Sequence, residues 1–436
     1  MIKPPVNIIG AGLAGCEAAW QLLRRGVPVK LYDIKPHRTT PAHSSPLFAE
    51  LVCSNSFRSD RIQNASGLLK EEMRCFDSLI INAADRTRVP AGSALAVDRK
   101  RFANDITQLL MSHPLMTFIS DEVTDIPQEP AIIATGPLTT DAMSRAITAY
   151  TNKAQLSFYD AAAPIVSADS IDMGIAFRAS RYGRGNDYIN CPMTEEQYDR
   201  FYQALLHAET APVHAFEEEK IFEACMPVES LAKRGRMTLA YGPMKPVGLM
   251  DPKTGRRPFA VVQLRHEDTP CTLYNLVGFQ TRLKFSEQKR VFSLIPGLEN
   301  VEFVRYGVMH RNTFLNSPGF LDRQFRVIGT KALFFAGQIT GVEGYVESAA
   351  SGMICGLTLA AVLFGRKIPD FPPTTSLGAL GRYVSAPNHD FQPMNINFGI
   401  MDTGSVKARS RGERYLEVAN KALAAVRIIR DSYETE

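Results

Sequence analysis

The stretch "VNIIGAGLAGCEAAWQLLRRGVPVKLYD", residues 6–33, has the pattern of a strand, a tight turn, a helix and a second strand. The apolar run 6–9 leads directly into the spacing G-x-G-x-x-G, where the helix begins. In that context Gly10 forms the tight turn, Gly12 lets the backbone approach a pyrophosphate, and Gly15 lets the helix pack close to the strand. The pattern therefore predicts the first unit of a doubly wound α/β fold.

The start of this helix is a predicted phosphate site, because a helix N-terminus offers unpaired N–H groups and the positive end of its dipole. Asp33 ends the second strand, where its carboxylate can accept a hydrogen bond from a ribose hydroxyl. A glycine-rich turn alone could be an ordinary loop, but both strands, the helix and the acid favour dinucleotide binding. The predicted cofactor residues here are Gly10, Ala11, Gly12, Leu13, Ala14, Gly15 and Asp33.

Two later stretches predict the return of the same sheet. "PAIIATGPL", residues 130–138, reads as a short buried strand that ends before Gly136. In "KALFFAGQITGVEGYVESAASGMICGLTLAAVLFG", residues 331–365, a strand is followed by a turn with Gly337 and Gln338, and then by a helix of small residues. A single-chain FAD domain is built in this way. Since no second G-x-G-x-x-G exists, any nicotinamide is expected to bind only transiently.

The length of 436 residues exceeds the roughly 250–300 residues of a single core. We expect a Rossmann-type, glutathione-reductase-like FAD-binding domain of the α/β class, interrupted by an inserted mixed α+β domain. The predicted segments are 1–150 (first part of the FAD domain), 151–300 (inserted substrate or RNA domain) and 301–436 (return segment and C-terminal helix). Other expectations are a capping-box helix from Thr194, strands at 257–265 and 272–283, a Pro-rich connection at 371–380, and a basic amphipathic helix within 406–430.

Composition favours a soluble enzyme: 45% of the residues are hydrophobic, 22% are charged, and the net charge is +4. The N-terminus lacks the pattern of a signal peptide. The longest apolar stretch, 353–364, is shorter than the roughly 20 residues of a membrane span, so we expect a cytoplasmic protein without membrane contact. The seven cysteines are scattered without C-x-x-C, which argues against a disulfide framework and against structural zinc. No metal site is predicted.

Two cysteines stand in unusual surroundings. Cys53 opens a polar cluster in "FAELVCSNSFRSD", residues 48–60, and Cys225 lies in "IFEACMPVESLAKRG", residues 221–235, before a group of basic residues. A disulfide reductase would need a partner thiol in C-x-x-x-x-C, but Arg58 stands at that place. Nearby cations would favour a reactive thiolate, whereas burial would make either thiol an inert hydrophobe; the residues alone leave both open. Cysteines 16 and 355 are expected to be packing residues.

Several longer segments resemble one family. They include "TPAHSSPLFAELVCSNSFRSD", "VPAGSALAVDR", "FEACMPVE", "YGPMKPVGL", "YNLVGFQTRLKFSEQKRVFSLIPGLENVEFVRYGVMHRNTF", "GQITGVEGYVESAASG" and "FQPMNINFGI". Together with the N-terminal motif they are distributed over nearly the whole chain and resemble the folate- and FAD-dependent tRNA (uracil-5-)-methyltransferases, often called TrmFO. There are two small departures, since Asp33 replaces the usual Glu and Ala224 replaces a common Gly.

The resemblance implies a chemistry. 5,10-Methylenetetrahydrofolate donates a one-carbon unit, by way of FAD reduced by NAD(P)H, to C5 of the T-loop uridine at position 54 of the tRNA. Uracil C5 is a poor nucleophile until a thiolate adds at C6. The resemblance gives that role to Cys225, with Cys53 assisting near the uracil and the flavin. The partner that the resemblance implies is the T-arm of tRNA, with the base expected to be flipped out. Clusters of basic residues are the candidate RNA contacts: Arg178, Arg181, Arg184, Arg282, Lys284, Lys289, Arg290, Lys407, Arg409 and Arg411.

Four alternatives remain open from the sequence. The chain could be an MnmG-like wobble-uridine enzyme related to the GidA flavoproteins, although those chains are longer, or it could modify a ribosomal RNA uridine. It could also be a flavin oxidoreductase of a small molecule, or an RNA chaperone with structural FAD. The folate-binding residues, the choice between NADH and NADPH and the oligomeric state are not predicted.

Overall fold

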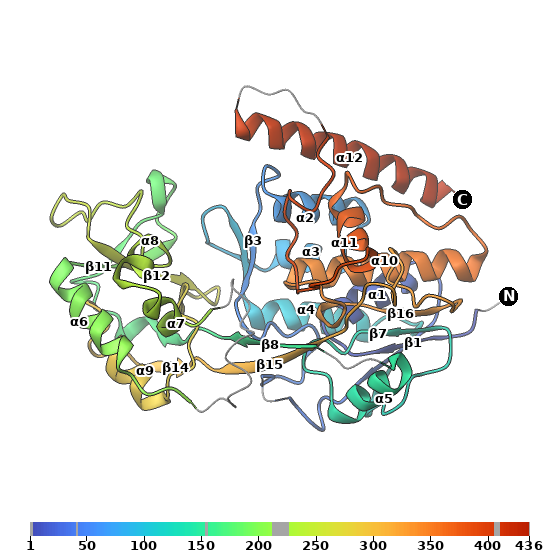
Figure 1. The fold of residues 1–436 in the computed structure, drawn as a ribbon, viewed down its shortest axis with the longest axis horizontal. Helices are drawn as coiled ribbons and strands as arrows, with labels where there is room; N and C mark the ends of the chain where they lie inside the picture. Colours follow the sequence, from blue (N-terminus) through green and yellow to red (C-terminus); the bar gives the residue numbers. More distant parts are fainter. Residues whose placement is uncertain (1–2, 41, 153–155, 212–225, 405–409, 436) are drawn as a thin grey trace.

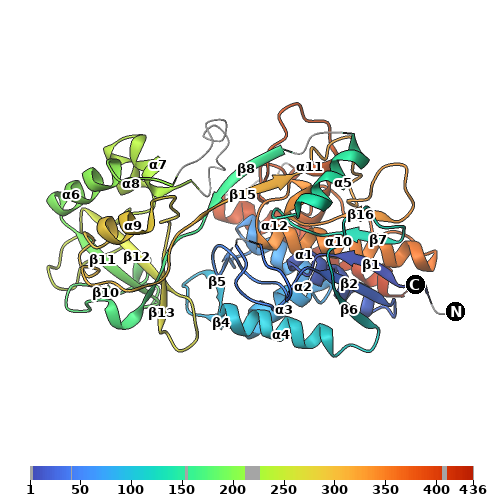
Figure 2. The same ribbon diagram turned by 90° about the horizontal axis from the view of Figure 1, so that it is seen from below.

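The computed structural model describes residues 3–40, 42–152, 156–211, 226–404 and 410–435. Two lobes lie side by side, and both chain ends are on the larger one (Figure 1). An antiparallel ribbon of β8 (Leu156–Ala161) and β15 (Met309–Phe314) runs between the lobes, as the view from below shows (Figure 2). The chain therefore leaves the larger lobe along β8 and returns to it along β15.

The larger lobe is built on a five-stranded sheet in the order β16-β7-β1-β2-β6, in which all pairs are parallel. The two strands of the opening motif are paired at its centre, and the two predicted return strands follow on one side. This confirms the predicted α/β Rossmann-type fold. The strands are β1 (Val6–Ile9), β2 (Val29–Asp33), β6 (Met116–Ser120), β7 (Ala131–Ile133) and β16 (Leu333–Phe335).

Both faces of this sheet are covered. Ile8 and Phe334 point into the main core with helices α1 (Leu13–Leu23) and α10 (Tyr345–Phe364), whereas their neighbours Ile9 and Phe335 pack with α5 (Asp141–Thr151) on the other face. Alternate residues of a strand point to opposite faces, and strands buried on both faces are continuously apolar. The unbroken apolar runs of the sequence therefore reflect a sheet between two helical layers.

Small residues of α10 let it cross α1 closely. A Cβ at Gly352 would lie 2.1 Å from the carbonyl oxygen of Ala14, and one at Gly356 would lie 2.8 Å from that of Ala18. Helix α10 is long and apolar enough to cross a membrane, but 89% of its most apolar window is buried inside the protein. It is therefore a core helix.

Among the described residues, the smaller lobe has a six-stranded antiparallel sheet with the order β10-β11-β12-β13-β9-β14 and a core of its own with four helices. This agrees with the predicted mixed α+β composition, while the exact division into three segments stays a prediction. The elements are β9 (Ile165–Ser167), β10 (Phe177–Arg178), β11 (Tyr188–Met193), β12 (Ala260–His266), β13 (Leu273–Leu276), β14 (Phe303–Arg305), α6 (Glu195–Leu206), α7 (Val228–Lys233), α8 (Arg236–Tyr241) and α9 (Phe285–Phe292).

Two local predictions in this lobe have clear outcomes. The capping box is present, because the Thr194 hydroxyl accepts from the Gln197 N–H and the Gln197 side chain accepts from the Thr194 N–H. The strand predicted for 272–283 is shorter than expected and ends at Leu276. Gly278 then adopts a φ of +79°, which breaks the extended conformation.

The prediction of a Pro-rich connection at 371–380 was wrong over its second half, where α11 (Ser376–Ser385) begins. The Thr375 hydroxyl caps this helix, and the buried carboxylate of Glu72 accepts from the N–H groups of Ser376 (2.7 Å) and Leu377 (2.9 Å). A capping acid from a distant segment is not visible in the local sequence. The predicted C-terminal helix is α12 (Arg411–Thr435), which packs against α2 (Ala65–Cys75).

The remaining elements complete the larger lobe near the cysteine loop. A small antiparallel sheet has the order β3-β5-β4 and lies, with α2 and two further helices, between β2 and β6 in the chain. Its parts are β3 (Ser56–Ser59), β4 (Arg88–Val89), β5 (Ala94–Val97), α3 (Leu79–Arg86) and α4 (Arg99–Met111).

Candidate functional site

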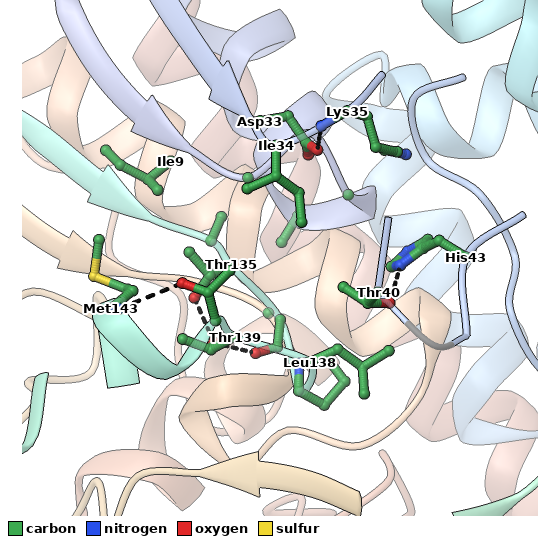
Figure 3. A pocket seen from close by; sticks show the side chains of 18 of the residues that line it. Ile9, Asp33, Ile34, Lys35, Thr40, His43, Thr135, Leu138, Thr139 and Met143 are labelled. Atoms are coloured by element: carbon green, nitrogen blue, oxygen red, sulfur yellow. Dashed lines mark hydrogen bonds between the residues drawn. The ribbon is translucent and has the colours of Figure 1, made fainter. Parts of the chain in front are cut away.

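A pocket opens at the carboxyl ends of the parallel strands, where doubly wound folds bind their ligands. It contains about 1120 Å³ of empty space, including its open mouth. Figure 3 shows Asp33, Ile34 and Lys35 on one side and Thr135, Leu138 and Thr139 on the other. Eight of the predicted cofactor residues line it: Gly10, Gly12, Leu13, Ala14, Asp33, Gly136, Gly337 and Gln338.

The three motif glycines have different physical roles. Gly10 has a φ of +105°, and a Cβ there would lie 2.4 Å from the carbonyl oxygen of Ala134. A Cβ at Gly15 would lie 1.9 Å from the carbonyl oxygen of Gly10, whereas one at Gly12 would meet nothing within 4 Å. Gly10 and Gly15 are therefore required by the protein's own packing. Gly12 instead leaves open space at the N-terminus of α1, where no side chain caps the helix.

The carboxylate of Asp33 is fixed by two backbone N–H groups. Ala11 donates to Oδ2 at 2.7 Å, and Lys35 donates to Oδ1 at 3.0 Å. A carboxylate can accept about four hydrogen bonds, so capacity remains for a ribose hydroxyl in the pocket that Asp33 lines. Ala11 and Gly15 do not line the pocket. Ala11 orients the Asp33 carboxylate, and Gly15 lets α1 pack close to the turn at Gly10.

The other end of the pocket is made by the return segment. Gly337 has a φ of +85°, and its N–H donates to the Ser351 hydroxyl at 2.7 Å. Tyr345 and Ser348, in the first turn of α10, also line the pocket. The pocket thus joins an open, uncapped helix N-terminus and an acid at one end to a glycine-shaped turn at the other. These residues fit an extended dinucleotide such as FAD.

Cys53 lies next to this pocket. The Tyr345 hydroxyl accepts from the N–H groups of Cys53 (2.9 Å) and Ser54 (3.2 Å), and Val52, like Tyr345, lines the pocket. The half-buried Cys53 thiol lies 3.7 Å from the carbonyl oxygen of Ala161 at the end of β8. Cys53 therefore lies where the return-segment end of the pocket meets the ribbon between the lobes.

The second predicted catalytic thiol, Cys225, lies outside the described residues. Of the described cysteines, Cys16, Cys191 and Cys355 are fully buried. Burial raises the pKa of each of these three thiols, so they are expected to be inert packing residues. No group of three or more His, Cys, Asp or Glu side chains is arranged as a metal site in the part of the chain that the structure describes.

Sequence reasoning missed the residues that hold the Cys53 loop. Arg99, Arg265 and Arg305 donate hydrogen bonds to it, and Glu267 pairs with Arg99. Arg265 ends the apolar run "FAVVQL", and an arginine within a buried strand is a signal that could have been followed. The sequence could not show that these arginines contact one loop, because Arg99, Arg265 and Arg305 come from three distant segments.

Most of the described arginines and lysines proposed as RNA contacts have partners within the protein. Arg178 donates to the Tyr274 hydroxyl, and Arg181 donates to Gln263 and to the carbonyl oxygens of Lys245 and Val247. Lys284 pairs with Glu209, Arg290 pairs with Glu287, and Arg282 is buried. Lys407 and Arg409 lie outside the described residues. The RNA-contacting residues stay a prediction.

Comparison with known proteins defines the class. The structure of GidA from Aquifex aeolicus matches with a TM-score of 0.69 at 15% identity, over 99% of this chain and 75% of that chain. At this identity the likeness shows the fold, which is that of GidA. The sequence pattern of the family "Glucose inhibited division protein A" matches residues 5–367, so the chain is a member of this GidA family.

Two curated relatives narrow the class further. Proteins from Bacillus velezensis and Pelotomaculum thermopropionicum are 55% and 58% identical to this chain, over 98% and 97% of its length and 99% and 97% of theirs. Both are named "Methylenetetrahydrofolate--tRNA-(uracil-5-)-methyltransferase TrmFO". Within the GidA family, the chain therefore belongs to the TrmFO family, which confirms the resemblance found in the sequence.

Proposed function

We propose that this chain is a tRNA-modifying enzyme that transfers a one-carbon unit from 5,10-methylenetetrahydrofolate, by way of FAD reduced by NAD(P)H, to C5 of the T-loop uridine. The observation that carries the proposal is the position of Cys53. Its loop contacts the dinucleotide pocket through Tyr345, so a thiol and a flavin would face the same reaction space. Family membership over nearly the whole chain supports the same reaction.

Residues of the pocket would hold FAD in one orientation. The N–H groups at the start of α1 and the open space at Gly12 would take the pyrophosphate, and Asp33 would accept from the adenosine ribose. Gly337, Gln338 and Tyr345 would flank the flavin end. When bound, FAD supplies the redox chemistry and the carrier for the one-carbon unit.

The two thiols divide the work on the base. The Cys225 thiolate forms a bond to uracil C6, which makes C5 nucleophilic toward the one-carbon unit, and this bond breaks when the C5 proton has left. Cys53 is placed to assist in removing that proton. The role of Cys225 rests on the family resemblance, and that of Cys53 also on its place beside the pocket.

The test is mass spectrometry of undermodified tRNA after incubation with the enzyme, NAD(P)H and 5,10-methylenetetrahydrofolate. Ribothymidine is expected in the T-loop and should be lost when either small molecule is left out. A matched tRNA with cytidine in place of the T-loop uridine should remain unmodified. Modification of the wobble uridine instead would support the MnmG-like alternative, and flavin turnover without any RNA product would support a small-molecule oxidoreductase.

A cytoplasmic location accords with this proposal, because tRNA, folate and nicotinamide cosubstrates are all available there. The T-arm is the proposed contact region of the tRNA. A uridine that is stacked inside the T-loop must be flipped out to reach a pocket between strands and ribbon.

A further inference from the structure

The loop that carries Cys53 is held at every residue from Leu51 to Asn55 by an arginine side chain. Arg99 donates to the carbonyl oxygens of Leu51 (2.5 Å) and Cys53 (2.7 Å), and Arg305 donates to that of Val52 (2.6 Å). Arg265 donates to the Ser54 hydroxyl (2.8 Å) and to the amide oxygen of Asn55 (3.0 Å). On the other side of the loop, the N–H groups of Cys53 and Ser54 donate to Tyr345.

These arginines come from both lobes. Arg99 begins α4 in the larger lobe, Arg265 is on the central strand β12 of the smaller lobe, and Arg305 ends its edge strand β14. All three interact electrostatically with the Cys53 thiol. The conformation of the cysteine loop therefore depends on the position of the smaller lobe's sheet.

The cluster carries more positive than negative charge. Glu267, which pairs with Arg99, is the carboxylate that acts on all three of these guanidinium groups. Arg265 and Glu267 are buried, and burial followed by repulsion from Arg99 lowers the pKa of Arg305. An excess of positive charge removed from water is costly unless an anion accompanies it. The ionisable groups at the held loop are the Cys53 thiol and the Tyr345 hydroxyl, and the thiol is the better candidate for the anion because the ordinary pKa of a thiol is lower than that of a phenol.

We propose that Arg99, Arg265 and Arg305 are positioning residues that hold Cys53 as a thiolate beside the flavin pocket. The thiol proton is released to solvent, and the thiolate takes the place of the missing counter-charge. A thiolate at this point is a base that could accept a proton from the substrate. This step rests on the proposed function, whereas the ionisation of Cys53 does not.

The test measures carboxamidomethylation of Cys53 by iodoacetamide as a function of pH, in the FAD-loaded enzyme without RNA or folate, with peptides quantified by mass spectrometry. Cys271, a half-buried cysteine in the same chain, is the internal reference. In the wild type, Cys53 should reach its limiting rate at a lower pH than Cys271. In Arg305→Gln the midpoint of the Cys53 rate profile should move up by about one pH unit, because one positive charge beside the thiolate is lost.

Two variants separate charge from packing. Arg305→Lys keeps the charge and should restore most of the rate, although lysine lacks the guanidinium geometry. Arg178→Gln removes an arginine from β10, at the opposite edge of the same sheet, and should leave the Cys53 profile unchanged. Equal pH profiles for Cys53 and Cys271 in the wild type would overturn the proposal, as would an unchanged Cys53 profile in Arg305→Gln.

The outcomes remain informative if a variant is damaged. Flavin absorbance and circular dichroism report whether Arg305→Gln is folded, and if it is not, the comparison of Cys53 with Cys271 in the wild type decides alone. Because the assay contains no RNA, failure of the wild type to make ribothymidine would contradict the proposed function and leave this result standing. If the Cys53 profile is shifted but no ribothymidine forms, the proposed function fails and the ionisation of Cys53 stands. If ribothymidine forms but the Cys53 profile is ordinary, the ionisation fails and the proposed function stands.

Discussion

Replacing Gly12 with valine should abolish FAD binding while leaving the FAD-free protein folded. A Cβ at this position meets no protein atom within 4 Å, and the backbone has a φ of −79° and an extended ψ, which valine adopts readily. The cost to the FAD-free protein is the loss of a favoured helix N-cap residue, about 1 kcal/mol or less. The methyl groups of valine would instead fill the space that a pyrophosphate needs.

Gly15→Ala is the matched control, with the opposite expectation. Its Cβ would lie 1.9 Å from the carbonyl oxygen of Gly10, which belongs to a turn that cannot move without separating α1 from β1. Overpacking of this kind costs roughly 1–3 kcal/mol or more, and the loss should be present without FAD. The two glycines are three residues apart in one motif, yet substitution of Gly12 should affect FAD binding and substitution of Gly15 should affect the stability of the FAD-free protein.

Unfolding of FAD-stripped protein, with and without added FAD, measures both effects. At a free FAD concentration of 100 Kd the wild type should gain about 2.7 kcal/mol in its free energy of unfolding, and Gly12→Val should gain nothing. Flavin absorbance after gel filtration gives an independent reading. A Gly12→Val protein that keeps a full complement of FAD, or a Gly15→Ala protein as stable as the wild type without FAD, would refute this reading of the motif.

Three further predictions follow from the site and its surroundings. Cys225→Ala should bind FAD and tRNA but make no ribothymidine and form no covalent adduct with tRNA bearing 5-fluorouridine. Cys53→Ala should lose turnover yet keep some adduct formation, and an adduct with Cys225→Ala would overturn the assignment. Affinity for tRNA should fall steeply with salt, by about 0.9 logarithmic units per phosphate contact for each tenfold increase, and a flat dependence would argue against a phosphate-binding surface. Burial lowers the pKa of Lys70 to about 8 from its ordinary value of 10.5, so between these pH values the folded protein binds fewer protons than the unfolded chain. The free energy of unfolding should therefore rise with pH across that window, and Lys70→Met should lose this rise. A rise of equal size in the variant would assign it to another group.

The half of the candidate site that the opening motif forms could be predicted from the sequence alone. The strand, turn and helix of residues 6–33 are local features, and Gly15 acts locally, because its close contact is with Gly10; the contact of Gly10 with Ala134 is the exception, since it joins two distant segments. The return strand and Gly337 could be found because apolar runs and glycine turns are also local patterns. The family resemblance added the two thiols, with Cys53 beside the pocket and Cys225 outside the described residues.

Only the tertiary structure showed what surrounds Cys53. Arg99, Arg265 and Arg305 reach its loop from positions 46, 212 and 252 residues away (99 − 53, 265 − 53 and 305 − 53), and Glu72 caps α11 from 304 residues away. Such contacts depend on where whole strands and helices are placed by packing, and no short stretch of sequence contains that information. The residue types were visible in the sequence, but the excess of positive charge around one thiol arises only when distant segments meet.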